Sequence, residues 1–145
     1  MITFPISKAG IIPTSNLLEI LCSIFNDIYL ITGNDGYNYF KEDDRFIIFG
    51  IKHEKGSSIF TRIINYFLTQ LKISYKMMKI SRKIDLWIFF IGGDILLLPM
   101  LIAKLSGKKV VLALAGSSYN SAVSSKNILT KLIKKFENIN RGLVF

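Results

Sequence analysis

The stretch DLWIFFIGGDILLLPMLIAKLSGKKVVLALAGSS, residues 85–118, decides the fold class of this chain. Leu86–Ile91 is a continuous apolar run, which is typical of a strand buried on both faces. A glycine pair follows it, and Ile95–Leu105 is long enough for a crossover helix. Val110–Leu114 then predicts a second buried strand. The stretch therefore predicts one βαβ unit of a parallel sheet.

Small and polar residues follow both predicted strands, at the edge of the sheet where open α/β proteins bind ligands. Asp94 is also placed to cap the amino terminus of the crossover helix. Glycine turns let a ligand approach the backbone closely, because they carry no Cβ atom. The sequence leaves open the alternative that these glycines only form turns and contact no ligand. The candidate binding residues at this edge are Gly92, Gly93, Asp94, Gly116, Ser117 and Ser118.

A membrane span is the competing interpretation of Leu86–Ala103, which reaches the lower end of the length that crosses a bilayer. Asp94 lies at the centre of this run, where an acidic group costs about 2.5–3.5 kcal/mol. The pair Gly92-Gly93 and Pro99 interrupt it further. We therefore favour a strand and a helix, and a small membrane-inserted protein spanning near 86–103 is an alternative.

The remainder of the chain alternates predicted strands with predicted helices. Asn16 and Glu19 resemble a capping box, and Gly33–Gly36 is a strong turn signal. The alternation predicts an α/β, Rossmann-like doubly wound parallel sheet, with strand order 3-2-1-4-5 and right-handed crossovers. Further strands are expected at Ile2–Phe4, Ile28–Thr32 and Phe46–Ile51, and helices at Leu17–Phe25, Ile59–Arg82 and Asn127–Asn138.

Length and composition indicate one domain over residues 1–145. Half of the residues are hydrophobic, enough for a core of its own. The single cysteine, Cys22, excludes an intrachain disulfide and offers no metal cluster. Met1 is followed by a strand-like segment in place of a signal peptide, so a cytoplasmic location is expected. The short first strand and the apolar end Leu143–Phe145 predict a domain incomplete at both ends.

Positive charge gathers on the predicted helix Ile59–Arg82. The chain has a formal net charge of +9, and this segment carries lysines and arginines with no acidic residue. Such a helix lies on an anionic membrane surface or steers phosphorylated substrates. A solvated face over an ordinary core stripe is the plainer alternative. No recognised nucleic-acid motif accompanies the charge, so nucleic acid is not expected as a partner.

The sequence assigns no catalytic residue, metal ligand or cofactor. It contains no GxSxG elbow, no Walker loop and no complete GxGxxG. His53, the single histidine, is expected to be a loop residue rather than a base. Glu42-Asp43-Asp44 is expected to be a solvated turn beside Arg45.

Three segments, SKAGIIPTSNLLEIL (7–21), IYLITGN (28–34) and the stretch 85–118, resemble the amino-terminal half of a GT-B glycosyltransferase of family 4 type. The order and spacing of the elements carry the resemblance, over about residues 1–138. The glycine loop that follows the family's first strand corresponds to Lys8-Ala9-Gly10, which adds Lys8 and Gly10 as candidate binding residues. Ala115 stands where members often have a histidine before the glycine, here Gly116.

The resemblance implies the acceptor-side domain of an enzyme that moves a sugar from a nucleotide-sugar to a lipid-linked or glycan acceptor, without a metal or cofactor. In that family a second, carboxy-terminal Rossmann-like domain holds the donor, so the nucleotide-sugar would bind only through a domain that is missing here. We expect this chain to be inactive alone, and cytoplasmic or peripheral at the inner face of the membrane. A stand-alone binding half that pairs with a separate donor-binding chain is the alternative.

Overall fold

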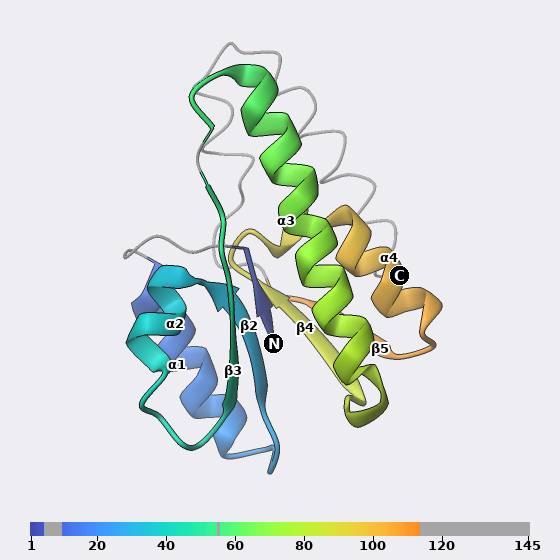
Figure 1. The fold of residues 1–145 in the computed structure, drawn as a ribbon. Helices are drawn as coiled ribbons and strands as arrows, with labels where there is room; N and C mark the ends of the chain where they lie inside the picture. Colours follow the sequence, from blue (N-terminus) through green and yellow to red (C-terminus); the bar gives the residue numbers. More distant parts are fainter. Residues whose placement is uncertain (5–9, 55, 114–145) are drawn as a thin grey trace.

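The computed structural model describes residues 1–4, 10–54 and 56–113. Their strands form a five-stranded, all-parallel sheet in the order β3-β2-β1-β4-β5, with helices packed against it (Figure 1). This architecture confirms the predicted α/β, Rossmann-like class and the predicted strand order. The strands are β1 (Ile2–Thr3), β2 (Tyr29–Gly33), β3 (Ile47–Ile51), β4 (Leu86–Phe90) and β5 (Lys109–Leu112). The helices are α1 (Ile11–Cys22), α2 (Asn34–Phe40), α3 (Ile59–Ile80) and α4 (Leu97–Leu105), with 3-10 turns η2 (Ser81–Lys83) and η3 (Gly93–Ile95).

Two hydrophobic clusters cover the two faces of the sheet, because successive side chains of a strand point to opposite faces. In Figure 1, α1 and α2 lie on one side of the strands and α3 and α4 on the other. Trp87 and Phe89 of β4 belong to the cluster under α3 and α4. Phe90 belongs to the cluster under α1 and α2. Helices therefore cover both faces of the central strands, whereas Ile47 of β3 and Val111 of β5 are exposed.

The central strand β1 is short and depends on its neighbours. The Thr3 hydroxyl donates a hydrogen bond to the Thr32 hydroxyl of β2, and the two oxygens lie 2.9 Å apart in a buried position. The Phe4 amide then donates to the Ile91 carbonyl, 3.2 Å away, at the end of β4. These bonds bring the exits of β1 and β4 together at one edge of the sheet.

Helix α1 begins at Ile11, and the predicted start at Leu17 with an Asn16–Glu19 capping box is wrong. Gly10 is the residue before the helix, and the buried Thr14 hydroxyl donates to its carbonyl at 2.7 Å. Pro13 falls in the first turn, where its missing N–H would have had no partner inside the helix. The proline therefore does not separate a loop from the helix.

The segment Gly33–Gly36 is also not the predicted turn, because Asn34 begins helix α2 directly after β2. Phe40, at the end of α2, is 3% exposed in the cluster that α1 also covers. Tyr37 packs its ring so close to Gly50 of β3 that a Cβ there would lie 3.0 Å from it. Packing of these two rings against the sheet thus overrides the local preference of glycine and asparagine for a turn.

Asp94 does not cap the crossover helix, contrary to the sequence expectation. It lies in the 3-10 turn η3, and α4 starts after Leu96 without a side-chain cap from its own segment. Gln70 of α3 supplies the bond from outside: its Oε1 accepts from the Leu98 amide at 2.9 Å. A long-range contact thus replaces the local cap.

The stretch 86–103 forms β4, η3 and part of α4 in place of the single span considered as an alternative. Within the part of the chain that the structure describes, no helix has the length and apolar character needed to cross a membrane. The predicted helix Ile59–Arg82 is α3 followed by η2. The helix expected at 127–138 and the strand expected at 143–145 lie outside the described residues.

We expect Gln70→Met to lower the free energy of unfolding by about 1–3 kcal/mol, because it leaves the Leu98 amide without its acceptor in a part-buried site. Urea unfolding followed by fluorescence measures this, since the single tryptophan, Trp87, is 1% exposed. Asn65→Leu is the control, because it removes an exposed bond of the same helix, to the Glu54 carbonyl at 3.0 Å. Equal losses in the two variants would contradict the expectation.

Candidate functional site

The carboxyl ends of the parallel strands bring five chain segments to one edge of the sheet. Phe4 leaves the central strand β1, and Gly33 leaves β2. Lys52–Glu54 follow β3, Ile91–Ile95 follow β4 and Ala113 follows β5. This is the edge where open α/β sheets bind ligands, so its side chains are the first candidates for a site.

Phe4 contacts residues from several elements at this edge. Its ring lies edge-on to the His53 ring, with centroids 5.1 Å apart, and 6.2 Å from the Tyr66 ring. A Cβ on Gly92 would lie 2.8 Å from the Phe4 Cβ. Residues from β1, the β3–α3 loop, α3 and the β4–α4 loop therefore meet at one side chain.

The hydrogen bonds of Thr69 favour a proton on Nδ1 of His53. The Thr69 hydroxyl has one hydrogen, which it donates to the Asn65 carbonyl at 2.7 Å. His53 Nδ1 lies 2.8 Å from the same hydroxyl oxygen, so Nδ1 is the donor in this contact. In the neutral imidazole, Nε2 is then the nitrogen that accepts a proton.

Tyr66 and Asp94 add two further ionisable groups. The Tyr66 hydroxyl donates to the Ile95 carbonyl, which ties α3 to the loop after β4. Burial, and secondly the charge of Asp94, raise the pKa of Tyr66 to about 12. Asp94 itself is 3% exposed. The edge therefore contains a buried carboxylate, a phenol that stays protonated and an imidazole.

The loop after β4 has an unusual backbone. Ile91 has a φ of 25° and Gly92 a φ of 71°. A positive φ is a genuine outlier for a β-branched residue such as isoleucine. Strain of this kind persists only where surrounding contacts hold it, and it gathers at functional sites. The loop that carries three of the candidate residues is thus the strained one.

The structure brings together Gly92, Gly93 and Asp94, and places Gly10 at the start of α1 after the exit of β1. Both loop glycines have a packing reason for lacking a Cβ. On Gly93 it would lie 2.7 Å from the Phe89 Cβ, and on Gly92 it would meet Phe4. Lys8, Gly116, Ser117 and Ser118 lie outside the described residues.

Three residues of this edge were not predicted from the sequence: His53, Tyr66 and Thr69. His53 does lie in a loop, as expected, but this loop follows β3 at the carboxyl edge. The signal that could have marked His53 is its position just after a predicted buried strand, at the edge where such sheets bind ligands. Tyr66 and Thr69 had no local signal, because only the packing of α3 brings them to the edge.

Within residues 1–4, 10–54 and 56–113, no three histidine, cysteine or carboxylate side chains are placed to hold a metal ion.

The acidic cluster after α2 is the expected turn: Asp43 pairs with Arg45, Oδ2 to Nη2 at 2.6 Å. The side-chain hydrogen bond from Arg45 lowers the pKa of Asp43.

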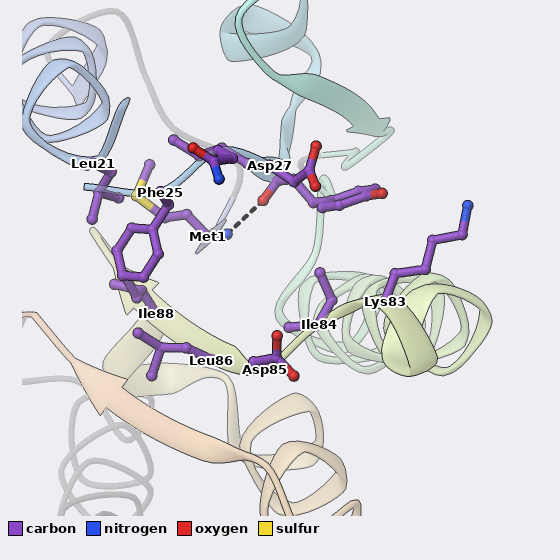
Figure 2. A pocket seen from close by; sticks show the side chains of 12 residues that line it. Met1, Leu21, Phe25, Asp27, Lys83, Ile84, Asp85, Leu86 and Ile88 are labelled. Carbon is purple, nitrogen blue, oxygen red and sulfur yellow. Dashed lines mark hydrogen bonds between the residues drawn. The ribbon is translucent and has the colours of Figure 1, made fainter. Parts of the chain in front are cut away.

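A cavity of about 300 Å³ lies at the opposite, amino-terminal edge of the sheet (Figure 2). Met1 lies inside it with its nitrogen bonded to the Tyr29 carbonyl, and Asp27 and Asp85 stand on facing sides. None of the described candidate residues lines it. The candidate site at the carboxyl edge and this cavity are therefore separate features.

Comparison of the chain with protein-family models, with curated proteins and with solved structures found no match. The resemblance to glycosyltransferases therefore stays a prediction from the sequence.

Gly92→Ala should destabilise the protein more than Gly107→Ala. Both residues have a positive φ, 71° and 69°, which costs a residue with a Cβ about 1–2 kcal/mol. The Gly107 Cβ would meet nothing within 4 Å, whereas the Gly92 Cβ would also press on Phe4. The difference between the two free energies of unfolding isolates the Phe4 contact. Equal values would mean that this contact is not close.

Tyr66 should make stability depend on alkaline pH. Its pKa is about 12 in the folded chain against 10.0 for the exposed phenol, so its contribution is present below pH 10 and is lost as the pH rises toward 12. Unfolding midpoints from pH 8 to pH 11 should fall less steeply for Tyr66→Phe than for the unchanged chain. Tyr39→Phe, at a 61% exposed position, serves as control. An unchanged slope in Tyr66→Phe would contradict the burial of this phenol.

Proposed function

We propose that this domain is the acceptor-side half of a glycosyltransferase, which receives a lipid-linked or glycan acceptor at the carboxyl edge of its sheet. The observation that carries the proposal is that His53 and Tyr66 both pack against Phe4 at that edge, and that the charge of Asp94 acts on Tyr66. The parallel sheet with order β3-β2-β1-β4-β5 supports it, because it is the arrangement that the family resemblance implies for this half.

The chemistry of sugar transfer gives His53 a role in the proposal. An acceptor hydroxyl oxygen forms a bond to the anomeric carbon of the donor sugar, and the bond from that carbon to the nucleotide phosphate breaks. The hydroxyl proton must leave as the new bond forms, and a positioned imidazole is the commonest acceptor for such a proton. In the proposal His53 takes up this proton through Nε2, because Nδ1 lies 2.8 Å from the Thr69 hydroxyl oxygen.

Tyr66 and Asp94 fit the binding of a polyhydroxylated ligand. The Tyr66 hydroxyl donates its hydrogen to the Ile95 carbonyl, so its oxygen can accept a bond from a sugar hydroxyl, as a carboxylate also does. The strained loop from Ile91 holds Asp94 at this edge. A second domain would have to hold the nucleotide-sugar in line with the acceptor, because orientation of both reactants supplies much of the rate.

The first part of the test is acceptor binding. A panel of prenyl-phosphate-linked saccharides and free oligosaccharides is titrated into the 145-residue chain by calorimetry. We expect at least one acceptor to bind, and His53→Ala and Asp94→Asn to weaken it about tenfold, the effect of one lost hydrogen bond. Lys41→Gln, a substitution at an exposed position after α2, should leave the affinity unchanged.

The second part is turnover. Supplied with nucleotide-sugars and acceptors, the chain should release no nucleotide above a heat-killed control. Release of nucleotide would overturn the assignment of this chain to one half of the enzyme. Binding of nucleotide-sugars without any acceptor binding would overturn its assignment to the acceptor side.

A further inference from the structure

Helix α3 exposes a row of apolar side chains along most of its length. The members recur at intervals of three, four or seven residues, with Leu68 beside Phe67, so they share one face of the helix. They are not the core-facing residues of α3, among which Ile73 and Met77 are at most 1% exposed. We name this set the α3 apolar row: Phe60, Ile64, Phe67, Leu68, Leu71 and Met78, with exposed fractions from 41% to 72%.

A second exposed stripe of α3 is basic. Lys72 reaches back to the Lys52 carbonyl, with Nζ 3.4 Å from the oxygen, and Lys76 Nζ lies 4.3 Å from the centroid of the Phe49 ring. These contacts place the lysines on the flank of α3 nearest β3. Lys79 continues the stripe, and Arg82 and Lys83 follow in η2. The helix thus has a buried stripe, an apolar row and a basic stripe.

The charge of the basic stripe is not balanced by carboxylates on the same helix, since residues 59–80 contain no aspartate or glutamate. The ion pairs formed within the described ranges, Arg45–Asp43 and Lys52–Glu54, include no cation of α3. The α3 apolar row and the basic stripe beside it are together complementary to a surface with an apolar interior and an anionic exterior.

We propose that α3 docks this domain on the surface of an anionic lipid bilayer. The α3 apolar row enters the boundary between headgroups and acyl chains, and the lysines lie against lipid phosphates. A second copy of the chain is a poorer occupant, because it presents the same basic stripe and the same net charge of +9. The proposal does not depend on the proposed function.

The position of α3 connects this surface with the candidate site. Figure 1 shows the amino-terminal half of α3 rising beyond the carboxyl ends of the strands. Tyr66, on the same helix, contacts Phe4 and the Ile95 carbonyl at that edge. A bilayer bound along α3 would therefore lie beside the carboxyl edge of the sheet.

The test is co-flotation of the 145-residue chain with vesicles of phosphatidylcholine containing about 30% phosphatidylserine, compared with phosphatidylcholine alone. We expect binding to the anionic vesicles, weakening as salt rises from 0.1 to about 0.5 M. Each lysine near such a surface contributes about fivefold in affinity, so the triple variant Lys72→Gln, Lys76→Gln, Lys79→Gln should bind on the order of 100-fold more weakly. The matching triple change to arginine should retain binding.

Two matched controls separate α3 from the rest of the surface. Neutralising Lys41, Lys108 and Lys109 removes the same charge outside α3, and should weaken binding far less. Phe67→Ser with Leu71→Ser should weaken binding about tenfold or more. Ile20→Ser with Ile24→Ser, at positions 58% and 65% exposed on the other side of the sheet, should not. Trp87 fluorescence confirms that each variant is folded.

Three results would overturn the proposal. Equal binding to neutral and anionic vesicles would remove the role of the basic stripe. Equal losses from the two lysine triples would show that overall charge acts, and not α3. Sedimentation of the lipid-free chain as a dimer that Phe67→Ser with Leu71→Ser dissociates would assign the α3 apolar row to a second copy.

Discussion

Two hydrogen bonds from α3 hold the crossing from β4 to α4, and the carboxyl edge of the sheet depends on them. The Tyr66 hydroxyl donates to the Ile95 carbonyl, and the Gln70 amide oxygen accepts from the Leu98 amide. Helix α4 has no side-chain cap from its own segment, so the bond to Gln70 takes that place. Since Gln70 is 2% exposed, water cannot easily replace it as the partner of Leu98. A helix that contacts the sheet through apolar residues thus also directs a loop through polar ones.

The short central strand transmits this constraint to the candidate site. Phe4 follows β1 directly, and its amide is bonded to Ile91 in the strained loop. Its Cβ occupies the space that a side chain at Gly92 would need, while the His53 ring packs edge-on against the Phe4 ring. The imidazole, the phenol and the strained loop therefore all contact the Phe4 side chain.

Apolar runs made the sheet predictable, because a strand buried on both faces leaves the same mark wherever it lies in the chain. β4 and the strand order follow from such runs and from the alternation with helices. β5 lies close to its predicted place, but it is not buried on both faces as predicted, since Lys109 and Val111 are exposed at the edge of the described sheet. Local signals failed where distant contacts compete with them. The glycines after β2 favour a turn, but Phe40 and Tyr37 gain more by packing on the sheet as part of α2. Asp94 suits a helix cap, yet Gln70 provides one from another helix. For the same reason, the loop at Gly92–Asp94 could be predicted as a candidate site from the sequence. Tyr66 and Thr69 could not, because they reach the carboxyl edge only in the folded chain.

The two hydrophobic clusters have a consequence for how this sequence tolerates change. They have no buried member in common, and the backbone of the sheet separates them. Substitutions without shared partners act nearly independently on stability. A substitution at Leu18 of α1 is thus compensated by changes at Leu21 or Phe40, and not by changes at Met77 or Met100. The two faces can therefore accumulate substitutions independently. The layer that contains α3 can remain constrained by the carboxyl edge that it supports, while the sequence of the opposite layer changes more freely.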